Sequence, residues 1–207
     1  MPNTPAAAPA VSSTVGLKNM VIAPVTADTE TATTYGDLKR VASAIEATIT
    51  PKNNDPDIQY FDDVEGDVLY PDPELTFKTK LADLPLIVQE MIFSNKIDDN
   101  GVLIRTANDK PGYFAVGFMS EKANGTYRYV WLFKVRAKPV TETYATKEGT
   151  SITRQTGEVE WTAIKRTSDG RYQAVADEGE NGFNGFTAEK AATFLNTVYT
   201  PVFTTSE

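Results

Sequence analysis

Two long β-type runs on either side of an Asn-Gly pair constrain the fold of this chain more than any other feature. Residues 113–121 and 126–138 are rich in aromatic and β-branched side chains, which favour strands. Asn124-Gly125 between them tolerates the positive φ values of a tight hairpin turn. In the second run, alternate residues share one face: Tyr127, Tyr129, Trp131, Phe133 and Val135. Val130 and Leu132 lie on the opposite face, so we expect a central hairpin whose second strand is buried on both sides over part of its length.

Shorter runs predict further strands along the chain. Residues 16–25, 41–50 and 74–81 read as single strands, and the last of these alternates cleanly between apolar and polar positions. A second hairpin is predicted from residues 158–167 and 171–176 around the turn Ser168-Asp169-Gly170. The sequence therefore predicts a mainly β protein, with two packed antiparallel sheets in a sandwich or barrel-like arrangement.

Two helices are expected to flank the sheets. The first covers about residues 83–94, with Asp83 as N-cap, Pro85 in the first turn and an apolar stripe that continues through Ile92. The second is short and C-terminal: it follows Thr187 and ends before Pro201. The residues that we expect in the core are Leu84, Ile87, Val88, Met91, Tyr129, Trp131 and Phe133.

The chain divides into three predicted parts. Residues 1–14 are expected to form a mobile N-terminal arm, residues 15–180 the β domain and residues 181–207 a C-terminal extension. The first residues show neither a basic region nor an apolar run, and no stretch reaches the roughly 18 apolar residues of a membrane helix. We therefore expect an unprocessed, cytoplasmic protein that does not contact a membrane.

The chain has no cysteine and no histidine, which excludes several classes of site. Disulfides, zinc sites built from Cys or His, and Ser-His-Asp or Cys-His catalysis all need one of these residues. Residues 98–101 (Asp-Asp-Asn-Gly) suggest a calcium loop, but the matching first and twelfth positions hold Lys96 and Ala107, which cannot ligate calcium as that loop requires. We expect no catalytic, cofactor-binding or metal-binding residue.

A long acidic segment, residues 52–73, separates two predicted strands. Connections of this length are often functional in a compact domain. The segment is expected to be a solvated or intersubunit loop, although cation binding or a catalytic carboxylate pair are alternatives. Its acidic residues are Asp55, Asp57, Asp62, Asp63, Glu65 and Asp67.

An ordered set of segments between residues 15 and 180 resembles those of one protein family. The segments are 15–24 (VGLKNMVIAP), 61–63 (FDD) with Glu65, 83–86 (DLPL), 99–102 (DNGV), 111–118, 123–134 (ANGTYRYVWLFK) and 146–147. Together they resemble the major tail proteins, or tail tube proteins, of long non-contractile-tailed phages of Gram-positive bacteria.

The resemblance implies a structural, non-enzymatic protein. Tail tube subunits form stacked hexameric rings, and one sheet of each subunit joins its neighbours into a β-lined lumen that conducts viral DNA. The implied partners are further copies, the tape measure protein, the tail terminator and the distal tail protein, and the implied location is the virion tail after assembly in the host cytoplasm. Residues 1–14, 52–72 and 139–156 are the expected intersubunit contacts.

Charge agrees with this interpretation, and other classes remain open. The formal net charge of −8 disfavours tight binding of DNA phosphates, as a conduit requires. One alternative is a monomeric β-sandwich binding module, such as an adhesin or carbohydrate-binding domain. Others are a carboxylate-based hydrolase and another tube-forming structural protein of the same fold.

Overall fold

The computed structural model describes residues 12–41, 44–52, 57–61, 64–69, 74–139, 157–179 and 186–203. The protein is mainly β, and all the strand pairs within these ranges are antiparallel. The strands are β1 (Thr14–Asp28), β2 (Thr33–Tyr35), β3 (Lys39–Arg40), β4 (Ala44–Lys52), β5 (Asp57–Phe61), β6 (Val64–Leu69), β7 (Glu74–Leu81), β8 (Lys96–Ile97), β9 (Leu103–Ile104), β10 (Tyr113–Lys122), β11 (Tyr127–Ala137), β12 (Gly157–Ala163) and β13 (Gln173–Asp177). The helices are α1 (Leu86–Phe93) and α2 (Ala188–Thr193).

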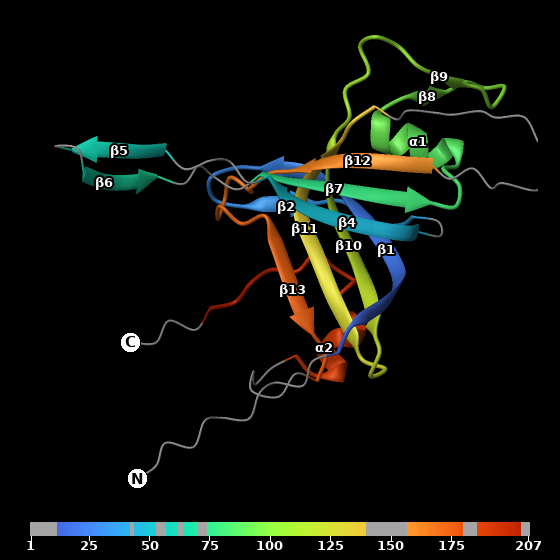
Figure 1. Ribbon diagram of the computed structural model, residues 1–207. Helices are drawn as coiled ribbons and strands as arrows, with labels where there is room; N and C mark the ends of the chain where they lie inside the picture. The colour runs from blue at the N-terminus through green and yellow to red at the C-terminus, as the bar shows by residue number, and fades with distance from the viewer. Residues whose placement is uncertain are drawn as a thin grey trace, which may run out of the picture.

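Nine strands form one continuous sheet that folds over on itself. The order is β2-β1-β10-β11-β12-β7-β4, with β13 on β11 and β3 on β1. Figure 1 shows β12, β7 and β4 running across β10 and β11, so the two halves of the sheet form two layers. The expected pair of packed sheets is thus realised as two halves joined through β11 and β12.

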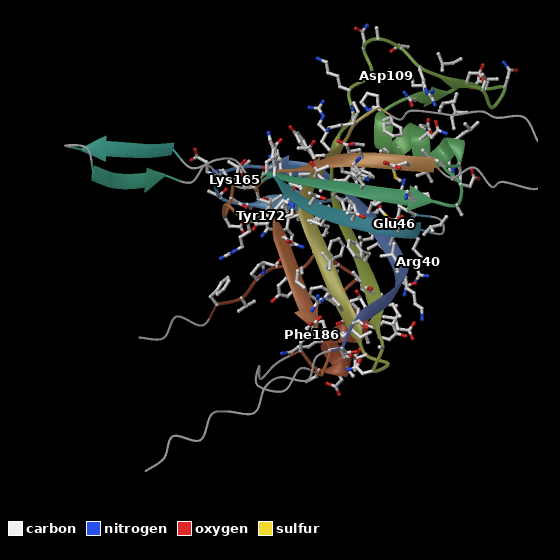
Figure 2. All side chains as sticks on the ribbon, viewed as in Figure 1. Arg40, Glu46, Asp109, Lys165, Tyr172 and Phe186 are labelled. Atoms are coloured by element: carbon white, nitrogen blue, oxygen red, sulfur yellow. The ribbon has the colours of Figure 1, made fainter. Side chains whose placement is uncertain are left out.

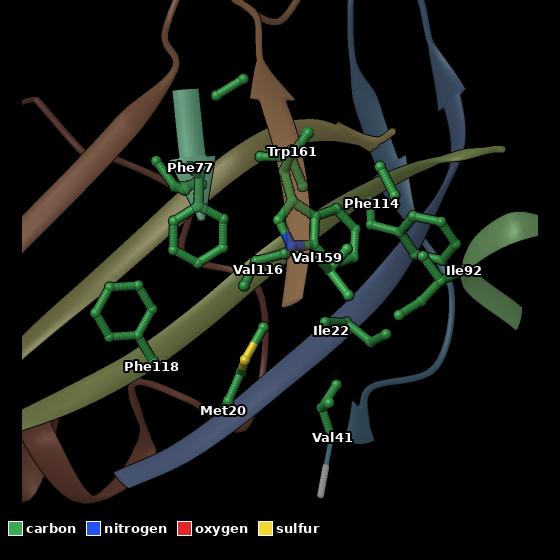
Figure 3. Packing of buried hydrophobic residues seen from close by; sticks show 14 of the residues in the cluster. Met20, Ile22, Val41, Phe77, Ile92, Phe114, Val116, Phe118, Val159 and Trp161 are labelled. Atoms are coloured by element: carbon green, nitrogen blue, oxygen red, sulfur yellow. The ribbon is translucent and has the colours of Figure 1, made fainter. Parts of the chain in front are cut away.

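The main core lies between these two layers. Phe77 of β7 and Phe118 of β10 stack with ring centroids 5.8 Å apart, and Trp161 of β12 meets Phe114 of β10 edge-on at 6.4 Å. Figure 3 shows these rings in one cluster, in which Ile92 of α1 lies next to Phe114. Aromatic and aliphatic side chains from both layers are therefore removed from water in one cluster, which is the dominant stabilising term for a fold of this size.

The central hairpin is confirmed, and β11 is buried on both faces. Tyr129, Trp131 and Phe133 face one hydrophobic cluster, while Val130 and Leu132 face the other. Val135, expected on the Trp131 face, lies with Val130 instead. The register between Phe114–Val135 and Val116–Leu132 contains a β-bulge, and the extra residue turns the following side chains to the other face.

The predicted second hairpin is wrong in its pairing. Strands close to the predicted ranges exist, but β12 and β13 do not pair with each other. Both pair with β11: residues 161–163 of β12 lie along its end, and β13 lies along its beginning. The turn at Ser168-Asp169-Gly170 therefore joins the two layers rather than two neighbouring strands.

Helix α1 is shorter than predicted and rotated. It begins after Pro85 rather than after Asp83, and no side chain caps it. Ile87, expected in the core, is 70% exposed, while Val88 is buried and Leu84 and Met91 pack partly against the core. The inward face instead includes a glutamine, because Gln89 donates to the Leu84 carbonyl and accepts from Arg105.

The C-terminal segment packs on the second face of β10 and β11. Thr187 occupies the N-cap position of α2, although its side chain makes no capping hydrogen bond. Phe194 contacts the Tyr129 ring at 5.8 Å, and the buried Trp131 Nε1 donates to the Phe194 carbonyl at 3.0 Å. Phe186, which Figure 2 shows beside α2, closes the cluster against Phe194 at 5.1 Å. Residues 186–203 thus cover one outer face of the sheet.

Candidate assembly surface

The acidic segment contains a β-hairpin that stands apart from the main sheet. Among the described strands, β5 and β6 pair with each other and with no other strand, and Figure 1 shows them beyond the end of the two layers. Asp57 opens β5 opposite Leu69, and Asp67 of β6 lies opposite Gln59. A two-stranded hairpin alone has marginal stability in water, so its position suits a contact with another molecule.

The structure places only part of the predicted intersubunit set. Asp57 belongs to β5, and Glu65 and Asp67 belong to β6. Asp55, Asp62 and Asp63 lie outside the described residues, as do residues 1–11 of the arm and residues 140–156 of the extended segment.

Strand β4 offers a free edge. It pairs with β7 along its whole length and ends the strand order of the main sheet, with no second partner among the described residues. No described strand pairs with this edge, which carries a register shift between Ala44 and Glu46 and includes Pro51, a residue without an N–H. Lys52 at its end pairs with Glu74 of β7, which means that the acidic hairpin leaves and re-enters the body between two neighbouring residues.

The outer face of β4, β7 and β12 is polar apart from Ile45, which lies at the register shift of β4 and is 54% exposed. In β7 the apolar Leu75, Phe77 and Leu81 are buried inward, so the alternate residues point outward. We call these outward residues the polar sheet face: Glu46, Thr48, Thr50, Lys52, Glu74, Thr76, Lys78, Lys80, Glu158, Glu160 and Thr162. Thr79, which faces inward, is satisfied there because it accepts from the Trp161 indole at 3.1 Å.

Each lysine of the polar sheet face has a carboxylate partner. Lys80 Nζ lies 2.8 Å from Glu46, which projects from β4 (Figure 2). Lys78 Nζ lies 3.4 Å from Glu160 and 3.9 Å from Glu158. The hydrogen bond from Lys80 lowers the pKa of Glu46. The hydrogen bond from Lys138, the residue that follows β11, is the largest cause of the lowered pKa of Glu160. Both carboxylates are ionised at neutral pH. Such exposed pairs add little stability, and their main effect is to cancel the local charge.

A largely buried ion-pair network joins β13 to the end of β10 and the beginning of β11. Asp177 of β13 accepts two hydrogen bonds from Arg128, at 2.7 and 2.6 Å, and lies 2.8 Å from Lys122 Nζ. The Asp177 and Lys122 side chains are each only 7% exposed. The hydrogen bonds from Arg128 and Lys122 outweigh burial and lower the pKa of Asp177 to about 2.

A second buried carboxylate ties β1 to β11. Burial alone raises the pKa of Asp28, but hydrogen bonds from Lys134, Thr33 and Thr167 outweigh it and hold the pKa well below its usual range. The Lys134 ammonium lies 2.5 Å from this carboxylate. Asp28 and Asp177 are thus saturated by partners within the fold, which gives them a structural role. Sequence reasoning identified neither, because their partners are distant in the chain.

A cavity of about 450 Å³ lies between the C-terminal segment and β1. Arg40, Tyr129 and Leu195 are among the residues that line it. Within the described part of the chain, no three acidic side chains are placed to hold a metal ion. In the same part, no helix is long and apolar enough to span a membrane.

No protein-family model matches the chain, and no curated protein matches it.

Proposed function

We propose that this protein is a structural subunit of a phage tail tube, in which copies form stacked hexameric rings around a lumen that conducts viral DNA. The observation that carries the proposal is the β5–β6 hairpin, which stands apart from the body of the molecule. In this proposal a neighbouring ring contacts the hairpin, which pairs with no other strand among the described residues.

The free edge of β4 supports the same proposal. An unprotected sheet edge is a liability in a monomer, and natural proteins usually block it or pair it. In a closed ring each copy covers the edge of the next, so no edge remains open. In this proposal β4 forms the lateral contact between subunits and the acidic hairpin forms the contact between rings.

The proposal includes partners and a location. The partners are further copies of this chain, the tape measure protein, the tail terminator and the distal tail protein. DNA passes without specific binding, and the subunit has no catalytic role. The protein assembles in the host cytoplasm and functions in the virion tail.

Removal of residues 53–70 tests the role of the hairpin. Because Lys52 and Glu74 are cross-strand partners, the three residues that remain between them can close a short β4–β7 turn. We expect the deletion to preserve the circular dichroism spectrum and cooperative melting of the parent while abolishing tubes in negative-stain electron micrographs.

A matched control replaces residues 53–70 by a Gly/Ser linker of equal length, which keeps the chain length and removes the hairpin. It should fold and also fail to form tubes. Normal tubes from either variant would remove the hairpin from the inter-ring contact.

A further inference from the structure

The two outer faces of the folded sheet differ in how they are covered. Residues 186–203 pack over the face that carries Tyr129 and Trp131. No described segment packs over the polar sheet face of β4, β7 and β12. As far as the described residues show, the polar sheet face is therefore the bare one of the two.

The composition of the polar sheet face fits a surface along which a polyanion slides. Three lysines and four glutamates stand on these three strands, so the local net charge is −1. Every lysine already has a carboxylate within 4 Å, and threonines fill the remaining positions. Phosphates gain little from cations whose charge is cancelled nearby, because tight DNA binding needs uncompensated Lys or Arg that release counterions.

The connections of β4 and β7 also favour this face as the wall of a tube. β4 provides the free edge at which a neighbouring copy can extend the sheet, and the acidic hairpin links the end of β4 to the start of β7. The proposed lateral contact therefore lies on a strand of the polar sheet face, and the proposed inter-ring contact lies in the hairpin inserted between two of its strands, β4 and β7. Extension at β4 would join these faces around the ring into one wall.

We propose that the polar sheet face lines the lumen of the tube and faces the passing DNA, whereas the face covered by α2 lies on the outside. This inference rests on the proposed function. It assigns DNA, a polyanion, as the molecule that passes this face, and it assigns no base-specific or tight phosphate contact to it.

Single-cysteine labelling tests the assignment directly, because the chain has no cysteine of its own. Thr76→Cys places a thiol near the middle of the polar sheet face, and Thr162→Cys, its cross-strand neighbour, is a second variant in case the first disturbs folding. Glu189→Cys on the exposed surface of α2 is the matched control for the outside. Each variant is labelled before and after tube formation, with a small maleimide and with a maleimide attached to a bulky protein.

In the unassembled protein all three variants should react with both reagents. In tubes, Thr76→Cys and Thr162→Cys should keep their reaction with the small reagent and lose at least tenfold in rate with the bulky one, whereas Glu189→Cys should react with both. Equal bulky labelling of Thr76→Cys and Glu189→Cys in tubes would place the polar sheet face outside and overturn this inference alone. Loss of reaction with the small reagent as well would make the face a subunit interface and also overturn it. Failure of the unsubstituted chain to form any tube would overturn the proposed function and this inference with it.

Discussion

Substitution of Gly117 by alanine tests one packing contact in the hydrophobic cluster that contains Trp131 and Phe194. Gly117 lies directly opposite Trp131 in the β10–β11 pair, and the fully buried indole folds back over the glycine. A Cβ at position 117 would lie 2.8 Å from three ring carbons of Trp131. Ordinary carbon–carbon contacts are roughly 3.5–4.0 Å, so the ring must move by about 0.7 Å or more.

The cost follows from what the ring loses when it moves. Overpacking of a tight core costs about 1–3 kcal/mol. Strain on the bond from Trp131 Nε1 to the Phe194 carbonyl adds about 0.5–1.5 kcal/mol. The lower entropy of the unfolded chain offsets about 0.4–1 kcal/mol. We therefore expect Gly117→Ala to lower the free energy of unfolding by about 2 kcal/mol, and the melting temperature by about 4–8 °C for a domain of this size.

Urea and thermal denaturation measure the effect, with two controls. Gly16→Ala has no atom within 4 Å of the new Cβ and should change stability by less than about 0.5 kcal/mol. A double-mutant cycle with Trp131→Phe, which removes the far ring of the indole, should reduce the cost of Gly117→Ala by about 1 kcal/mol. An unchanged melting temperature for Gly117→Ala, or a cost that is the same in both backgrounds, would refute the close contact with the indole.

Three further predictions concern the buried side chains of Asp177 and Trp131. Asp177→Asn leaves the buried Lys122 without its carboxylate and should lower the free energy of unfolding by about 3 kcal/mol in urea denaturation, whereas Glu158→Gln in an exposed pair should cost less than about 1 kcal/mol. Because folding lowers the pKa of Asp177 from 3.8 to about 2, its contribution should be complete above about pH 4 and lost as the pH falls towards 2, and the Asp177→Asn variant should show a weaker acid dependence in melting curves. Trp131→Phe removes the indole donor to Phe194 and should make residues 186–203 more sensitive to limited proteolysis, while equal cleavage of variant and parent would show that this bond does not hold the segment.

Local patterns predicted most of the strands because each depends on neighbouring residues. The Asn124-Gly125 turn and the clean alternation of residues 74–81 were sufficient to locate the central hairpin and β7. The same alternation already placed Lys78 and Lys80 on one polar face. Their carboxylate partners on β4 and β12 are far away in sequence, and only the fold brings them together.

The errors arise where tertiary packing overrides the local pattern. Val135 changes face because one extra residue enters β11, and no sequence period marks such a bulge. Ile87 lies outward because Gln89 is satisfied inside by a backbone carbonyl and a guanidinium, which an apolar stripe does not predict. β13 likewise pairs with β11, which is distant in the sequence, and the turn signal at Ser168-Asp169-Gly170 predicts only the nearby β12 as its partner.

Electron microscopy of the purified protein at high concentration tests the central claim most directly, with tail initiator proteins added if none assembles spontaneously. Our account predicts hollow tubes of stacked sixfold rings with a continuous lumen. A protein that remains strictly monomeric under all these conditions, with neither rings nor tubes, would contradict it.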